Sequence, residues 1–320
     1  MTAIGPVLSG AVGVLLQLLV VIALAPLLTG MMRQLRAVLE GRAGAGIGQP
    51  YRDLRKLLRK QPIRPRGTGG VFRMAPLVLV ATCMVVAGAA PFVTTVSMLD
   101  PIADLFAVVA LLTLGTVALA LAGIDTGTAF GGMGASREMT IVALVEPTLL
   151  VSIFALSVPV GSTNLGAIVT AGLDDPAGVF SPVSLLAAVA LVVVIIAETG
   201  RLPVDNPSTH LELTMVHEAM VLEYAGPDLA LVEVASSMRL VVFLGLLANL
   251  FVPWGIATSD QPLALAIGVA VFVGKVALLG ALLAVAEVFL AKLRLFRVPE
   301  LLAGSFVLGL LAVAASFFLA

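Results

Sequence analysis

The chain has 320 residues, of which 60% are hydrophobic and only 12% are charged. A soluble domain is about half apolar and about a quarter charged, so this composition excludes an ordinary soluble protein. It predicts an all-α integral membrane protein, a single polytopic domain over residues 1–320 in the inner or plasma membrane of the cell. The net charge of −1 gives no reason to expect a nucleic-acid partner.

Eight apolar runs are long enough to cross a bilayer as helices, because one span needs about 20 mostly apolar residues. Their approximate bounds are 6–32, 75–96, 102–123, 139–160, 183–200, 229–252, 263–287 and 301–319.

The first basic residue, Arg33, comes after the first run, so we do not expect that run to be a cleavable signal. The single cysteine, Cys83, can form neither a disulfide within the chain nor a thiolate cluster site.

Basic residues gather in the loops on one side of the predicted bundle. Eleven of the 18 Lys and Arg residues lie between residues 33 and 73, the segment called here the basic loop. Further ones on the same side are Arg137, Arg201, Lys292, Arg294 and Arg297. The opposite loops, around residues 100, 174–175 and 260, have no Lys or Arg. The positive-inside rule therefore predicts that the basic loop is cytoplasmic and that both termini lie outside.

Within the basic loop, the stretch "QPYRDLRKLLRKQP" predicts a short amphipathic helix. Pro50 suits the first helical turn, and Pro62 ends the pattern. The residues that share its apolar face are Tyr51, Leu54, Leu57 and Leu58. Two compatible interpretations stay open: a helix anchored on anionic lipid at the surface of the bilayer, and a docking surface for a cytoplasmic protein.

The segment 197–227, "AETGRLPVDNPSTHLELTMVHEAMVLEYAGP", concentrates ionisable groups directly after the fifth run. Asn206 can cap a helix over 207–224 that the following Gly-Pro pair ends, inside an acidic cytoplasmic loop over 200–228. Both histidines, His210 and His217, lie on it, about 10.5 Å apart along a helix axis. That distance is too long for the pair alone to share a metal ion or to ligate a haem, so we expect no metal site.

Several ionisable residues also lie at the edge of the apolar runs or inside them: Glu138 is at the start of the fourth run, and the others are Glu146, Glu198, Arg239, Lys275 and Glu287. Charged groups at such depth are costly, usually face a protein interior or a watery cavity, and mark ion or proton paths. Burial also shifts their pKa values toward neutrality. The alternative is that the acids after the fifth run are only solvated surface carboxylates. We predict a proton or ion relay formed by Glu138, Glu146, Glu198, Asp205, Glu212, Glu218, Glu223 and Lys275.

Lys275 lies near the middle of the seventh run, where an ammonium needs a partner. Glu287 is twelve residues further on, about 18 Å of helix rise, and cannot reach it within the same helix. We therefore expect a partner from another span, and Glu146 is the first choice within the chain.

The motifs "AETGRLPVDNP", "HEAMVLEYAGP" and "GGMGASRE" with a following "VEP" resemble the membrane subunit of complex I that docks the peripheral arm. The resemblance is strongest to that subunit's counterpart in membrane-bound nickel–iron hydrogenases and formate hydrogenlyase. The stretches "QPYRDLRKLLRK" and "LRLFRVPELL" match as well, so the resemblance covers nearly the whole chain.

This resemblance implies an eight-helix fold, docking to cytoplasmic electron-transfer subunits, and an acidic funnel that couples redox chemistry to ion movement. The motif acids are the carboxylates of the predicted relay. The residues expected to dock are Arg42, Gln49, Tyr51, Arg52, Asp53, Arg55, Lys56 and Arg201. The quinone-reducing branch of the family has "AETNRAPFD", whereas Gly200, Leu202 and Val204 stand at the differing positions here. The segment "NPSTHLELTM" is of the hydrogenase type, which argues against quinone binding.

Four hypotheses compete. The first is a non-catalytic membrane subunit of an oxidoreductase complex, with no cofactor of its own and with nickel–iron (NiFe) and iron–sulfur centres on its partners. Those partners would be hydrogenase-like large and small subunits, an iron–sulfur protein and antiporter-like membrane subunits. Alternatives are the quinone-site subunit of an NADH dehydrogenase-type complex and a stand-alone secondary ion transporter, although the inverted repeats of many transporters are not visible. A passive anchor would leave the buried acids unexplained.

Overall fold

The computed structural model describes residues 4–205, 215–291, 293 and 297–319. Within them every regular element is helical. The elements are α1 (Ile4–Leu39), α2 (Gln49–Leu58), α3 (Gly70–Ala89), the 3-10 turn η1 (Asp100–Ile102), α4 (Leu105–Asp125), α5 (Ala129–Val160), α6 (Leu165–Asp174), α7 (Pro176–Val179), α8 (Pro182–Glu198), α9 (His217–Val221), α10 (Gly226–Phe251), α11 (Pro262–Phe289) and α12 (Val298–Leu319). This confirms the predicted all-α membrane fold.

Each of the eight predicted apolar runs lies on one helix. Within the described residues, seven helices are long and apolar enough to cross a membrane: α1, α3, α4, α5, α10, α11 and α12. The fifth predicted run is α8, whose 17 residues are at the lower limit for a span. Helix α6 is also apolar but has only 10 residues, too few to cross a bilayer.

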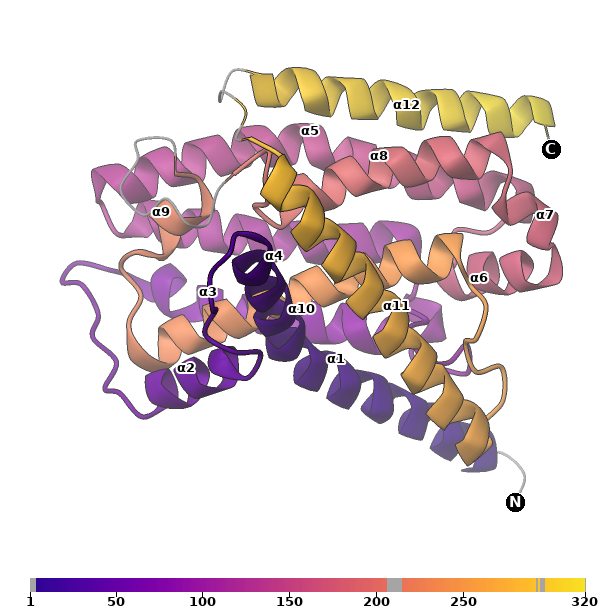
Figure 1. The fold of residues 1–320 in the computed structure, drawn as a ribbon, viewed down its shortest axis with the longest axis horizontal. Coiled ribbons are helices and arrows are strands. Elements are labelled where there is room, and N and C mark those ends of the chain that lie inside the picture. Colours follow the sequence, from indigo (N-terminus) through magenta and orange to yellow (C-terminus); the bar gives the residue numbers. More distant parts are fainter. Residues whose placement is uncertain (1–3, 206–214, 292, 294–296, 320) are drawn as a thin grey trace.

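The helices pack as a bundle in which α5 contacts α4, α8 and α12, while α10 contacts α1, α3, α8 and α11 (Figure 1). Helix α10 is the most enclosed, with Val241, Val242 and Phe243 fully buried. Helices α11 and α12 lie at the periphery, where Phe289 is 81% exposed and Phe318 is 88% exposed. A helix that is apolar on all sides suits both settings, because lipid and the core are equally apolar.

The two ends of the bundle differ in what they carry. In Figure 1 the beginning of α1 and the end of α12 lie at the right, together with α6 and α7, and α2 and α9 lie at the left. We call the end that carries α2 and α9 the basic end, because the basic loop belongs to it. The beginning of α1 and the end of α12 therefore lie at the end of the bundle opposite the basic end. The external position of both termini and the cytoplasmic position of the basic end stay predictions.

The predicted helix over 207–224 is wrong in the part that the structure describes. Only His217–Val221 form a helix, and Val216 has φ −115° and ψ −83°, which is not helical. The acidic sequence suggested a surface helix, but Ala219 and Met220 are buried against α4 and α5. A Cβ atom at Gly134 of α5 would lie 2.9 Å from the Cβ of Ala219, so a glycine permits this close packing. Packing thus outweighed the local helical pattern.

Candidate functional site: a charged cavity at the basic end

A cavity of about 770 Å³ lies among α1, α2, α5, α8, α9 and α10. Its walls contain many ionisable side chains, which is unusual for a chain with 12% charged residues. The charged residues and the histidine that line it are Arg33, Arg36, Asp53, Glu138, Glu198, Arg201, Asp205, His217, Glu218, Glu233 and Arg239. The fold therefore gathers, in one space, acids that the sequence places on four separate segments.

An ion pair between Glu198 and Arg239 forms one wall of the cavity. Glu198 is the last residue of α8 and Arg239 lies within α10, and their side chains are only 8% and 11% exposed. The Arg239 guanidinium also lies 5.7 Å from the ring centre of Phe243. Its Nε atom has no hydrogen-bond partner in the part of the chain that the structure describes. The guanidinium thus neutralises Glu198, and its Nε–H group has no acceptor among the described residues.

Glu138 and His217 complete the charged cluster around this pair. Glu138 of α5 lies within electrostatic range of Glu198, Asp205 and Arg239. His217 of α9 places its Nε2 atom 3.3 Å from the Ser236 hydroxyl. Burial lowers the pKa of His217, Arg239 lowers it further, and the carboxylates of Glu218 and Asp205 oppose the change. The histidine is therefore neutral near pH 7, and the carboxylate of Glu138 lies close to the Glu198–Arg239 pair.

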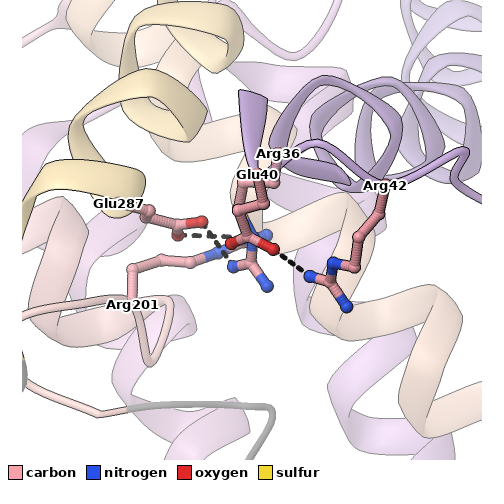
Figure 2. A network of polar contacts seen from close by, with 5 residues as sticks. All are labelled: Arg36, Glu40, Arg42, Arg201 and Glu287. Carbon is pink, nitrogen blue, oxygen red and sulfur yellow. Dashed lines mark hydrogen bonds and ion pairs between the residues drawn. The ribbon is translucent and has the colours of Figure 1, made fainter. Parts of the chain in front are cut away.

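A second arginine–carboxylate contact joins three elements beside the cavity (Figure 2). The Glu287 carboxylate of α11 is fully buried; its Oε2 accepts from Nη1 of Arg36 on α1 at 2.7 Å, and its Oε1 accepts from Nη1 of Arg201 at 3.2 Å. Arg201 lies in the turn after α8. Burial lowers the pKa of Arg201, and Glu287 opposes that change. Glu287 thereby anchors the turn that runs from Glu198 to Asp205.

The family model described as NADH dehydrogenase matches residues 12–318. The chain belongs to this family. Among curated relatives, hydrogenase-4 component C of Escherichia coli (strain K12) is 36% identical over 93% of this chain and 93% of its own length. Formate hydrogenlyase subunit 4 of the same organism is 34% identical over 93% of this chain and 96% of its own length.

More distant members of the family include the NADH-quinone oxidoreductase subunit 8 of Rhodothermus marinus, which is 29% identical over 65% of this chain and 61% of its own length. Among solved structures, a chain of the membrane-bound sulfane sulfur reductase, described as an archaeal respiratory membrane complex, has a TM-score of 0.81. That match covers 95% of this chain and 99% of the other at 21% identity, so it shows a shared fold.

The predicted relay residues of this family member separate into two groups. Glu138, Glu198, Asp205 and Glu218 line the cavity, whereas Glu146 and Glu223 are half-buried and do not line it. Glu146 lies on α5 about 12 Å along the axis from Glu138. Glu212, like His210, lies outside the described residues. Among the described residues, no three His, Cys, Asp or Glu side chains converge as metal ligands.

Lys275 lies apart from the cavity, and the predicted pair with Glu146 is wrong. Its ammonium donates to Oδ1 of Asn249 at 3.2 Å and to the carbonyl of Val252. Both acceptors lie near the end of α10, opposite the basic end. The ion pairs among the described residues do not include Lys275. Neutral dipoles at a helix C-terminus therefore solvate this ammonium.

The predicted docking residues lie in different surroundings, and their role stays a prediction. Exposed ones are Arg42, Tyr51, Arg52, Arg55 and Lys56. Arg42 pairs with Glu40 (Figure 2), and the Gln49 amide donates to Asp53 at 2.8 Å. Arg201 lies in the Glu287 bridge. Helix α2 itself is confirmed, with Pro50 in its first turn.

Sequence reasoning placed Arg239 and Glu287 inside spans but assigned neither to the site. Glu233, which also lines the cavity, was not singled out. A basic residue within an apolar run is itself a signal that a buried carboxylate lies opposite, and Arg239 fits that rule.

Proposed function

We propose that this chain docks the electron-transfer arm of a hydrogenase- or formate hydrogenlyase-type complex at its basic end and passes protons between that arm and the membrane interior. The family assignment makes it a membrane subunit of a hydrogenase-type or complex I-related assembly. The redox centres, nickel–iron and iron–sulfur, lie on the partners in this proposal. The chain itself supplies a docking surface and ionisable groups.

The observation that carries the proposal is the cavity that Glu138, Glu198, Asp205 and Glu218 line together, and in which Glu198 pairs with Arg239. Carboxylates that lie near one another in a partly desolvated space are costly to ionise together, so a proton is shared among them. A change of charge at the docked arm changes which carboxylate holds the shared proton. Glu198 then alternates between a carboxylate paired with Arg239 and a protonated acid, and the released proton passes to Glu138 or Asp205.

The relatives favour this proposal over a quinone-site role. The two hydrogenase-type relatives match over 93% of the chain, and the NADH-quinone oxidoreductase subunit 8 of Rhodothermus marinus matches over 65%. The same family membership argues against a stand-alone secondary transporter, because both hydrogenase-type relatives bear names of components of larger complexes. No observation in the cavity favours a quinone specifically, since its lining is rich in charge.

Docking is tested by affinity purification of the full chain from its native membrane. We expect iron–sulfur proteins to be retained with the wild-type chain and to be lost, in large part, from the charge-reversal variant Arg52→Glu/Lys56→Glu, because interface charges set electrostatic complementarity. The control variant Asp174→Lys/Asp260→Lys reverses two exposed charges at the opposite end and should retain them. Purification of the wild-type chain alone would contradict the proposal.

A further inference from the structure

A separate, apolar groove of about 390 Å³ opens at the basic end where α1, α2 and α10 meet. Ile22 and Pro26 of α1, Val234 of α10, and Tyr51, Leu54 and Leu58 of α2 line it. Several of these side chains remain accessible: Ile22 is 40% exposed and Leu58 is 59% exposed. The groove is therefore open on its outer side, unlike the charged cavity.

The groove continues into the surface of α1 that faces the bilayer. Leu15 and Leu19 precede Ile22 at helical spacing and are 67% and 65% exposed. Residues at these spacings form a stripe along one side of a helix. An apolar chain that lies along this stripe would thus lead directly into the groove.

Two arginines, Arg55 of α2 and Arg59 directly after its last residue, complete the lining of the groove. They are one helical turn apart, and like charges at this spacing repel each other. Neither side chain takes part in the ion pairs found among the described residues. The other cations of the helix, Arg52 and Lys56, do not line the groove. A single anion between Arg55 and Arg59 would relieve their repulsion, and guanidinium groups bind phosphate in a bidentate manner.

We propose that this groove binds one anionic phospholipid, with its phosphate between Arg55 and Arg59 and one acyl chain against Ile22, Pro26 and Val234. An apolar slot next to a pair of cations, on a helix with one basic and one apolar face, matches the two parts of such a lipid. A neutral isoprenoid compound would leave the arginine pair without a counter-charge.

The site has a structural consequence for the charged cavity. Leu54 lines both the groove and the cavity, and Pro50 and Asp53 of the same helix also line the cavity. Helix α2 is thus a wall between the two spaces. Its Tyr51 hydroxyl donates to the carbonyl of Ala23 on α1. A lipid that fills the groove holds this wall against α1 and α10.

The test compares two double variants that each remove two charges from α2: Arg55→Gln/Arg59→Gln and Arg52→Gln/Lys56→Gln. The full chain is purified in mild detergent, and the lipid retained per chain is extracted and measured by mass spectrometry. We expect the wild type and the second variant to retain phosphatidylglycerol or cardiolipin. The first variant should bind it about 30-fold more weakly, at a factor of about five per arginine.

A second measurement does not depend on retention during purification. Phosphatidylglycerol is added to delipidated full chain, and the unfolding temperature is followed, with phosphatidylcholine as the neutral control. We expect a rise with phosphatidylglycerol alone in the wild type and in Arg52→Gln/Lys56→Gln, and none in Arg55→Gln/Arg59→Gln. Equal retention and equal stabilisation in the two double variants would overturn the proposal, as would an equal effect of phosphatidylcholine or retention of a quinone in place of a phospholipid.

Discussion

The two ends of the bundle both bury polar groups, but they satisfy them in different ways. At the basic end, carboxylates meet arginines: Glu198 pairs with Arg239, and Glu287 bridges Arg36 and Arg201. At the opposite end, neutral amide side chains form hydrogen bonds with buried backbone groups. The Gln17 oxygen accepts from the backbone N–H groups of Phe92 and Val93 at 3.0 Å, and the Asn249 amide donates to the carbonyls of Pro91 and Phe92 at 2.8 Å.

This difference separates groups that can exchange protons from groups that only complete hydrogen bonds. Helix α3 ends at Ala89, and the backbone after it is not helical, so its polar groups need partners inside the membrane protein. Gln17 and Asn249 supply these partners with no titratable group. Lys275 joins the same network through Asn249. The basic end, in contrast, gathers several carboxylates, among them Glu138, Glu198 and Asp205, around one cavity.

The largest effect is expected from Arg239→Gln, which leaves the Glu198 carboxylate buried without its cation. Loss of one partner of a buried ion pair costs about 3–5 kcal/mol. Thermal unfolding of the purified protein should show a large decrease in stability, and the double variant Glu198→Gln/Arg239→Gln should recover most of it. A single variant as stable as the wild type would show that the pair does not hold α8 against α10.

The opposite end is tested by Asn249→Leu, which removes the partner of two buried carbonyls and of Lys275 at similar volume. Leaving such groups unsatisfied costs about 1–3 kcal/mol. We expect a loss of stability and no loss of proton movement in the assembled complex. If the variant folds normally but fails to move protons, the opposite end also belongs to the relay. The two ends would then not differ in function.

A smaller, pH-dependent effect is expected from His217. Its pKa in the folded protein lies below the ordinary value of 6.5, chiefly because of burial, so the unfolded chain binds the proton more strongly. The contribution of neutral His217 to stability is therefore complete above pH 6.5 and decreases as the pH falls below it, by at most about 1.4 kcal/mol per pH unit. Between pH 7 and pH 5, the free energy of unfolding should fall more steeply with decreasing pH for the wild type than for His217→Gln. The same pH dependence in both proteins would contradict this.

How far the sequence predicts this molecule depends on the range of the interactions involved. Apolar runs and the pattern of α2 are local, so all eight long apolar helices and the amphipathic helix follow from them. Glu198 and Glu138 were predicted to belong to the relay from their positions in apolar runs. Their common cavity could not be predicted, because it depends on how α5, α8 and α10 cross. The bridge at Glu287 depends likewise on α1, which lies about 250 residues earlier in the chain.

The two errors have the same origin. A cation in a span predicts a buried partner, but the sequence does not show whether that partner is a carboxylate or a backbone carbonyl, as for Lys275. An acidic segment predicts a solvated helix, but Ala219 and Met220 bind in the groove that Gly123 and Gly134 leave open. In both cases a contact between distant segments decided the outcome.

The central claim, that the basic end moves protons in response to redox chemistry, is tested most directly by Glu198→Gln in the intact complex reconstituted into vesicles. The measured quantity is the number of protons moved per electron transferred, with the exposed Glu300 changed to Gln as the control. The account predicts that Glu198→Gln assembles and transfers electrons but moves about 100-fold fewer protons per electron, as expected for loss of a positioned acid–base group, while Glu300→Gln behaves like the wild type. Wild-type proton movement in assembled Gln variants of both Glu198 and Glu138 would contradict it.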